Sequence, residues 1–196
     1  MIPEIRGAAS IAEVESAASV LDLVLGDVPG WQITRAQHLA TYLSTPGLLS
    51  IAFENDRIVG AVGCDGVGGV GAVAILKEYR GRGLGRRLLE RAEGILRARG
   101  ASAAGLGSLD GAVDFYLHCG YEPQLLVQFD PDVQDPEAVI RKLLGDVLAG
   151  RKVYRAEWQG NPQLWLQDRS VDWELKHRIE AVATGVIAQY TMSKPL

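Results

Sequence analysis

The chain has 196 residues, of which 47% are hydrophobic and 22% are charged, and its formal net charge is −4. These values are typical of one globular domain, or of a domain with a small appendage. No apolar run approaches the roughly 20 residues that span a bilayer, and the sequence does not open on a secretory signal. We therefore expect a cytoplasmic protein without a membrane partner, and the negative net charge argues against nonspecific nucleic-acid binding.

The first third of the chain predicts two helices and three strands. Ser10 and Thr34 are suited to begin the helices, because their side chains can accept a hydrogen bond from the first helical turn. The Asn55-Asp56 pair is typical of a tight turn between two strands. The expected elements are a strand over residues 2–6, helices over 10–25 and 34–42, and strands over 48–54 and 57–64.

A glycine-rich stretch follows at residues 66–71 and matches the G-x-G-x-x-G pattern of dinucleotide-binding loops. That pattern requires a helix after the glycines, whereas the apolar residues 72–76 predict a strand. We therefore interpret Asp65 and the glycines after it as the turn of a hairpin.

A second glycine-rich stretch, R-G-R-G-L-G at residues 80–85, stands between a predicted strand over 70–76 and a predicted helix over 83–99. Glycines at such a junction let backbone N–H groups approach a ligand, and a helix N-terminus favours an anion such as a pyrophosphate. The arginines of the stretch, together with Arg86 and Arg87, add positive charge. The Walker signature is missing, and Arg86 replaces the third glycine of a dinucleotide fingerprint. The stretch predicts a phosphate-binding loop of another kind.

The remainder of the chain predicts a strand near residues 101–106, a short helix around Tyr116, and a longer α/β segment. Its first expected elements are a strand over 125–129 and a helix over 135–150 with Leu143 on its apolar face. Strands over 153–158 and 163–168 follow as a hairpin around Gly160-Asn161-Pro162. A helix from Ser170 that buries Leu175 and Ile179 ends at Gly185, and a strand over 186–192 closes the segment. Counted from residue 125, this order fits a split β-α-β (ferredoxin-like) unit. In the alternative, which we favour, the first of these strands completes the preceding sheet and the rest is a small appendage.

Two segments together resemble the GNAT family of N-acetyltransferases. Arg80-x-x-Gly83-x-Gly85, after a strand and Glu78-Tyr79, resembles the family's acetyl-CoA-binding motif, and residues 112–121 (AVDFYLHCGY) resemble its later helix. The resemblance covers about residues 1–130 and implies an α/β (α+β) fold with a mixed, mostly antiparallel sheet flanked by helices. Residues 131–196 would then be a small C-terminal α/β extension.

The resemblance also implies a function: acetyl transfer from acetyl-CoA, as co-substrate, to a primary amine by direct attack. In the family a tyrosine at the position of Tyr116 often protonates the CoA thiolate. A strand before the loop pairs with the pantetheine arm, and a backbone N–H there can polarise the thioester carbonyl. The cofactor-binding residues so implied are Val73, Ala74, Ile75, Arg80, Gly81, Arg82, Gly83, Leu84, Gly85 and Arg86.

The sequence departs from the family pattern at two kinds of residue: the general base and a residue that contacts the cofactor. Residues 70–76 hold no Glu or His to serve as a general base, and Leu109 stands where an asparagine often contacts the cofactor. Asp65, Glu54 and His38 are candidate replacements for the base, and we assign no role to His118 or His177. A non-catalytic acyl-CoA-binding regulatory or interaction module is therefore the alternative function.

The sequence does not distinguish a small-molecule amine from a peptide amine as the acceptor of the acetyl group. Trp158, Trp165 and Trp173 in the extension predict either a small core or an interface such as that of a homodimer. Cys64 and Cys119 show no metal-ligand spacing, so we expect two buried thiols and no metal.

Overall fold

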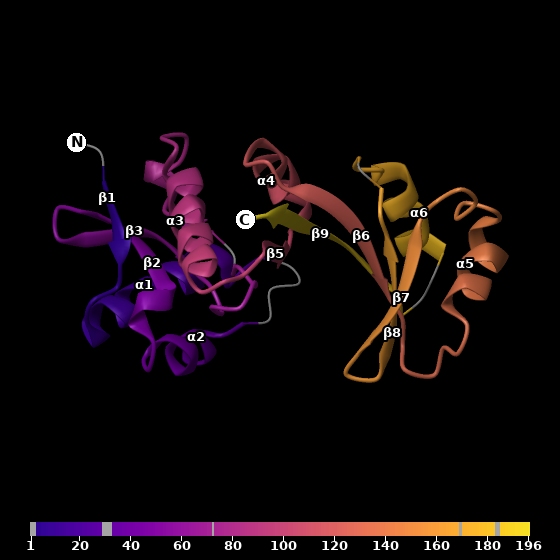
Figure 1. Ribbon diagram of the computed structural model, residues 1–196, viewed down its shortest axis with the longest axis horizontal. Coiled ribbons are helices and arrows are strands. Elements are labelled where there is room, and N and C mark those ends of the chain that lie inside the picture. The colour runs from indigo at the N-terminus through magenta and orange to yellow at the C-terminus, as the bar shows by residue number, and fades with distance from the viewer. Residues whose placement is uncertain (1–2, 29–32, 72, 169, 183–184) are drawn as a thin grey trace. The chain divides into compact units, whose positions relative to one another are not determined.

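The computed structural model describes residues 3–28, 33–71, 73–168, 170–182 and 185–196. The chain forms two compact units, Met1–Leu106 with Pro195–Leu196, and Gly107–Lys194. Antiparallel strands flanked by helices build both units, so the expected mixed α/β fold class is confirmed (Figure 1). The division between the compact units falls after Leu106, and the expected domain boundary near residue 130 stays a prediction.

The sheet of the first unit contains β1 (Glu4–Gly7), β2 (Leu49–Glu54), β3 (Arg57–Gly63) and β4 (Ala74–Ile75), in that order and antiparallel. The expected tight turn joins β2 to β3, since Asn55 and Asp56 have φ angles of 49° and 59°. Residues of β2 and β3 are buried on both faces of the sheet. This explains why these strands read as nearly continuous apolar runs.

Helices cover both faces of this sheet: α1 (Ile11–Leu25), α2 (Arg35–Tyr42) and α3 (Leu84–Ala98). A Cβ built at Gly60 would meet Leu88 of α3 at 3.2 Å, whereas one built at Gly63 would meet Tyr42 of α2. Positions 60 and 63 of a strand face opposite sides, so α3 lies on one face and α2, with α1 beside it, on the other. The expected caps are confirmed, since the Ser10 and Thr34 hydroxyls accept backbone hydrogen bonds of 3.3 Å.

The strand expected over residues 70–76 is much shorter than predicted. Only Ala74–Ile75 forms β4, while Val70 makes an antiparallel bridge to Cys64 that closes the glycine hairpin. In that hairpin the Asp65 carboxylate accepts three backbone N–H bonds, and these hold the glycines in a turn instead of a ladder. Residue 2, at which the first strand was expected to begin, and residue 72, within the strand expected over 70–76, lie outside the described residues.

The second unit contains α4 (Val113–His118), β6 (Glu122–Gln128), α5 (Pro136–Leu144), β7 (Val153–Trp158), β8 (Asn161–Leu166), α6 (Trp173–Val182) and β9 (Ile187–Pro195). Its strands lie in the order β9-β6-β8-β7, and every neighbouring pair is antiparallel. This is the topology of a split β-α-β unit in which β6 shares one sheet with the rest of the extension. Figure 1 shows α5 and α6 together on one side of this sheet.

Three local predictions for this unit were wrong. The α5 helix ends at Leu144 rather than near residue 150, and it buries Pro136 and Ile140, whereas Leu143, expected on its apolar face, is 40% exposed. The β7–β8 turn is Gln159-Gly160, so Gly160 lies in the turn as expected, whereas Asn161 and Pro162, also expected there, lie in β8. A third correction concerns the start of α6.

The carboxylate of Asp172, and not Ser170, accepts the bond from the first turn of α6, from the Leu175 N–H at 2.9 Å. The predicted burial of Leu175 and Ile179 on this helix is confirmed. With Ile140, these side chains cover the sheet face that carries Leu125, Val127 and Tyr190 and form the core of the unit.

The three tryptophans of the extension do not form one cluster. Trp173 packs edge-on against Tyr190, with ring centroids 5.2 Å apart, on the sheet face that α6 covers. Trp165 pairs across β8 and β6 with Leu126, a position that faces the other side, and Trp158 is 55% exposed. The expectation of two buried thiols is correct for Cys64 but not for Cys119, which is partly exposed.

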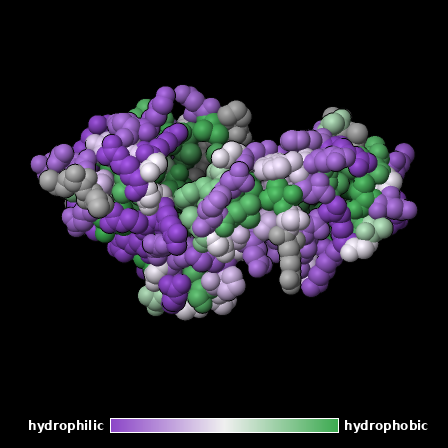
Figure 2. Space-filling view, turned by 90° about the horizontal axis from the view of Figure 1, so that it is seen from above, coloured by the Kyte–Doolittle hydropathy of each residue, from purple (hydrophilic) through white to green (hydrophobic). Residues whose placement is uncertain are grey.

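The surface mixes hydrophilic and hydrophobic residues, and purple, hydrophilic residues cover much of the face seen in Figure 2. Among the described residues, no helix combines the length and the apolar character needed to cross a bilayer.

Candidate active site

The loop of residues 80–86 connects β4 to α3 through a left-handed backbone. Gly81 and Gly83 have φ angles of +74° and +73°, and Gly83 is the N-cap of α3. A Cβ at either position would meet no atom within 4 Å, so it is backbone conformation and not crowding that requires glycine here. The first residue of α3, Leu84, is 1% exposed and anchors the loop in the core.

Backbone donors collect at the start of α3. The first hydrogen bond of the helix runs from Arg87 N–H to Gly83 O at 3.2 Å. The N–H groups of Leu84 and Gly85 precede this bond, at the end of a helix where backbone donors lack intrahelical acceptors. Together with the helix dipole, these donors favour a bound anion at this end of α3.

The arginines around the loop brace the chain itself. Arg80 Nε donates to Ile75 O at 3.0 Å, and Arg82 donates to Glu78 O at 3.0 Å, so both tie the loop to the segment before it. Arg86 pairs with Glu90 one turn along α3, at 2.9 Å, and Arg87 donates to Pro3 O at 3.1 Å. The side chains of Arg80 and Arg82, which were predicted to bind the cofactor, therefore hold the shape of the loop.

The β4 strand offers an open edge to a ligand. Leu76 N–H donates to Val59 O at 3.0 Å, so the neighbouring backbone groups of Ile75 point away from β3. The bond from Arg80 to the Ile75 carbonyl agrees with this direction. Ala74 instead pairs with Ala61 of β3. In the described part of the chain, no strand of the first sheet lies on the outer edge of β4.

The next strand in sequence, β5 (Ala103–Gly107), is bridged to the segment before β4. Gly69 and Gly105 form a parallel bridge, with Val70 N–H donating to Gly105 O at 2.9 Å and Gly105 N–H donating to Gly68 O at 2.9 Å. Further along, Ala74 and Ile75 pair with β3 alone among the described residues of this sheet. An extended chain of a ligand can therefore add to the outer edge of β4 in the manner of a strand.

Comparison with known families identifies this arrangement. The family model described as "Acetyltransferase (GNAT) family" matches residues 18–121, which is more than half of the chain. The chain belongs to the GNAT family of acetyltransferases. The match includes β4, the loop, α3 and α4, so the resemblance first seen in two motifs is confirmed. No curated protein matched the sequence.

Solved GNAT structures share the fold. A GCN5-related N-acetyltransferase from Rhodopseudomonas palustris is 16% identical, with coverage of 100% of this chain and 97% of its own and a TM-score of 0.52. Rv2747 from Mycobacterium tuberculosis, solved with CoA and NLQ, is 14% identical, with 99% of each chain covered and a TM-score of 0.53. The yncA protein of Salmonella typhimurium, solved with acetyl-CoA, is 16% identical, with coverage of 88% and 96% and a TM-score of 0.52.

Tyr116 of this GNAT chain belongs to the second unit, on α4. It is 4% exposed and packs edge-on against Phe115 and Tyr121, at centroid distances of 5.0 and 5.8 Å. The aromatic packing fixes its ring on a helix of six residues. The other predicted site residues, from Val73 to Arg86, all belong to the first unit.

The three candidate general bases, Asp65, His38 and Glu54, differ in hydrogen bonding and burial. The Asp65 carboxylate is occupied by the N–H groups of Val67, Gly68 and Gly69, at 2.8 to 3.0 Å. His38 is 8% exposed, and burial lowers the pKa of its imidazole below the ordinary value although Asp22 acts in the opposite direction. Glu54 ends β2 and is partly exposed. None of these three lies on β4, so the departure from the family pattern persists in the structure.

The sequence reading missed one charged residue that the fold buries, Lys176 of α6, which is bound to Asp110 just before α4. A signal existed, because Lys176 falls on the same helical face as Leu175 and Ile179. Leu109, which replaces the family's usual asparagine, lies between Asp110 and Ser108, whose hydroxyl donates to the Leu109 carbonyl at 2.9 Å.

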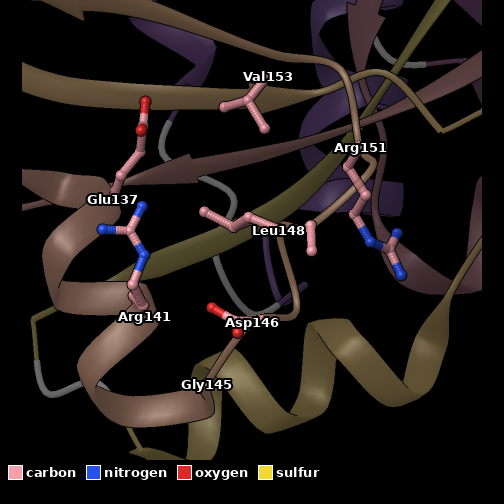
Figure 3. A pocket seen from close by; sticks show the side chains of 8 residues that line it. Glu137, Arg141, Gly145, Asp146, Leu148, Arg151 and Val153 are labelled. Atoms are coloured by element: carbon pink, nitrogen blue, oxygen red, sulfur yellow. The ribbon is translucent and has the colours of Figure 1, made fainter.

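A separate hollow of about 400 Å³ lies in the second unit between α5 and residues 145–153 (Figure 3). Two of its charged side chains have ion-pair partners: Arg151 pairs with Asp168 and Asp172, and Glu137 with Arg155. Figure 3 shows Arg151 directed away from Glu137 and Arg141. In the described part of the chain, no three His, Cys, Asp or Glu side chains gather as a metal site.

Proposed function

We propose that this GNAT protein transfers the acetyl group of acetyl-CoA to a primary amine by direct attack. The observation that carries the proposal is the continuous run from the open edge of β4, through the left-handed glycines, to the N–H groups that begin α3. A strand edge suits the pantetheine arm, and the helix N-terminus suits the pyrophosphate. Two proteins with this fold, Rv2747 and yncA, were solved with CoA and acetyl-CoA respectively.

Each predicted cofactor-binding residue has a part in this arrangement. The pyrophosphate would accept hydrogen bonds from the backbone of residues 81–86, which Arg80 and Arg82 hold in place. The pantetheine amides would pair with Val73 and with Ile75, whose backbone groups face the outer edge, while Ala74 supports the strand from β3. The N–H of Ile75 then serves as the donor that polarises the thioester carbonyl.

The reaction needs one proton at sulfur and releases one from nitrogen. The neutral amine forms an N–C bond to the thioester carbon, and the C–S bond breaks as the tetrahedral intermediate collapses. Tyr116 donates its phenolic proton to the departing sulfur and regains one from water. The ammonium proton of the tetrahedral intermediate leaves to water, since β4 carries no Glu or His that would take it, and the product is a neutral amide.

That missing base favours a second candidate, a chain that binds acyl-CoA without turning it over. The two candidates differ in the fate of the thioester, which can be followed as free CoA thiol released in the presence of primary amines.

Substitution of Tyr116 tests the proposed acid. Tyr116→Phe removes the hydroxyl and keeps the ring, so we expect kcat to fall by about 10²–10⁴-fold with the acetyl-CoA dissociation constant nearly unchanged. Tyr121→Phe is a matched control, because Tyr121 is equally buried at 3% exposure and packs on the same ring. Initial rates and calorimetric titration of both variants give the two quantities.

Full activity in Tyr116→Phe, or the same loss in Tyr121→Phe, would show that Tyr116 is not the acid. Tight acetyl-CoA binding without thiol release from the unchanged protein, over a panel of primary amines and amine-terminated peptides, would favour the non-catalytic candidate.

A further inference from the structure

We propose that Lys176 on α6 is a positioning residue that fixes the start of α4 and thereby orients Tyr116. The inference rests on the proposed function, because it assigns Lys176 a part in placing the residue that would protonate sulfur. All the contacts that carry it lie within the second unit.

Lys176 is a buried cation with two carboxylate partners. Its side chain is 4% exposed, and its Nζ lies 2.8 Å from Asp110 Oδ2 and 2.6 Å from Glu180 Oε1. Burial acts to lower the pKa of Lys176, but the two hydrogen bonds outweigh it and hold the pKa above its ordinary value. A charge is buried in this way only when it is paired, so the position of Asp110 is tied to that of α6.

Asp110 stands where the chain turns into the helix of Tyr116. It begins a single 3₁₀ turn, Asp110–Ala112, which continues directly into Val113 of α4. The α4 helix has only six residues and is too short to be stable alone, so its direction depends on what holds its ends. Lys176 holds the N-terminal end by the side chain of Asp110.

The residues just before this turn are fixed to β9. Ser108 N–H donates to Tyr190 O at 2.8 Å, and Gln189 Nε2 donates to Ser108 O at 3.3 Å. The Tyr190 hydroxyl in turn accepts a bond of 2.6 Å from Asp172 N–H, at the start of α6. Residues 108–110 are therefore held at the backbone by β9 and at the side chain by α6, and the two supports are bonded to each other.

This arrangement gives the α/β extension a role in the chemistry of the acyl site. Displacing a catalytic group by about 1 Å can lower a rate by 10²-fold while leaving ligand binding intact. Loosening the Lys176–Asp110 bond would release Asp110, six residues before Tyr116, and so the turn that leads into α4, without a change to any residue of the loop in the first unit.

Three variants test the proposal. Lys176→Met removes the charge, Asp110→Asn weakens the bond on the α4 side, and Glu180→Gln weakens the bond within α6. We expect Lys176→Met and Asp110→Asn to lower kcat by about 10–100-fold with acetyl-CoA affinity unchanged, and Glu180→Gln to lower it less than 3-fold. The double variant of Lys176 and Asp110 should be no worse than Lys176→Met, because both changes remove one contact.

Amide hydrogen exchange gives a readout that does not depend on activity. Exchange across residues 108–118 should be faster in Lys176→Met and Asp110→Asn than in the unchanged protein, and unchanged in Glu180→Gln. If Lys176→Met fails to fold, Asp110→Asn alone decides, because the Asp110 side chain is 51% exposed and its loss leaves the core intact.

Unchanged exchange in Asp110→Asn, or an equal loss of kcat in Glu180→Gln, would overturn the proposal even in an active enzyme. Faster exchange in a protein that never releases thiol would instead support the contact and contradict the proposed function, so the two failures can be told apart.

Discussion

At the scale of single residues, the cofactor loop depends on backbone conformation at two glycines and on side chains that brace it. Gly81 and Gly83 adopt φ angles that other residues rarely take, while Arg80 and Arg82 bond to carbonyls upstream. The positive φ values explain why glycine recurs at alternate positions in this loop, and the bonds explain why arginine stands between them.

Gly83→Ala should weaken both the fold and the loop. A left-handed alanine is less stable than glycine by about 1–2 kcal/mol, so we expect a lower midpoint of thermal unfolding and weaker acetyl-CoA binding. Gly94→Ala is a matched control, because Gly94 lies inside α3, also with open space around a built Cβ but without a positive φ. There alanine should stabilise the protein by about 0.5–1 kcal/mol and leave acetyl-CoA binding unchanged. Equal effects of the two changes would argue against the conformational account.

At the scale of elements, β1 and α1 are joined by an ion pair. Arg6 donates two hydrogen bonds to Glu13, of 2.7 and 2.8 Å, and Ala9 N–H donates a third of 2.7 Å. The bonds from Arg6, followed by that from Ala9, lower the pKa of Glu13 from 4.5 to about 2. The first turn of α1 is thus fixed to the edge strand of the sheet.

The shifted pKa of Glu13 predicts how the stability of the fold depends on pH. The folded state holds Glu13 ionised at pH values where the unfolded chain takes up a proton, so the stabilisation is present above pH 4.5 and is lost as the pH falls toward 2. We expect Glu13→Gln to lower the free energy of unfolding by about 1 kcal/mol at neutral pH. Urea unfolding at several pH values should show this difference disappearing in acid, with Glu15→Gln, an exposed glutamate of the same helix, as the control. A difference that persists undiminished below pH 3 would contradict the assignment.

The elements that the sequence predicts well are those set by local chemistry. The caps at Ser10 and Thr34 and the turn at Asn55-Asp56 depend on neighbouring residues, and the structure has them where they were expected. The short β4 was missed, because the three bonds to Asp65 shape the segment before it more strongly than its β-branched residues do. The α5 helix ends at Leu144 because the next residue, Gly145, has a φ of +74°. The apolar residues continue at helical spacing beyond Gly145, and they led to the longer predicted helix.

In the candidate site, too, the sequence predicts the local motifs but not the tertiary contacts that hold them. The loop and Tyr116 could be picked out from two motifs, but the direction of the Ile75 backbone follows from the register against β3, which no local pattern contains. Lys176 and Asp110 are 66 residues apart in sequence, so their contact depends on the topology of the second sheet. Tertiary pairing of this kind determines how a motif is held, and it is visible only in the folded chain.

At the scale of the whole molecule, the residues of the proposed function belong to two compact units. The first, Met1–Leu106 with Pro195–Leu196, carries the loop and the open strand edge, and the second, Gly107–Lys194, carries Tyr116 and the residues that hold its helix. The extension is built into the sheet that contains β6, since β9 pairs with β6 along its full length from Glu122 to Gln128. The extension therefore takes part in the fold around Tyr116, and its contribution to activity is open to the exchange and kinetic tests above.

The most direct test of this account is thermal unfolding with acetyl-CoA, with ATP and NAD as controls. Acetyl-CoA at about 100 times its dissociation constant should stabilise the protein by about 2.7 kcal/mol. For a chain of this length that corresponds to a rise of about 5–10 °C in the unfolding midpoint. The account predicts this rise for acetyl-CoA and a much smaller one for ATP or NAD. No rise with acetyl-CoA, or an equal rise with ATP, would contradict a cofactor site at the loop and the edge of β4.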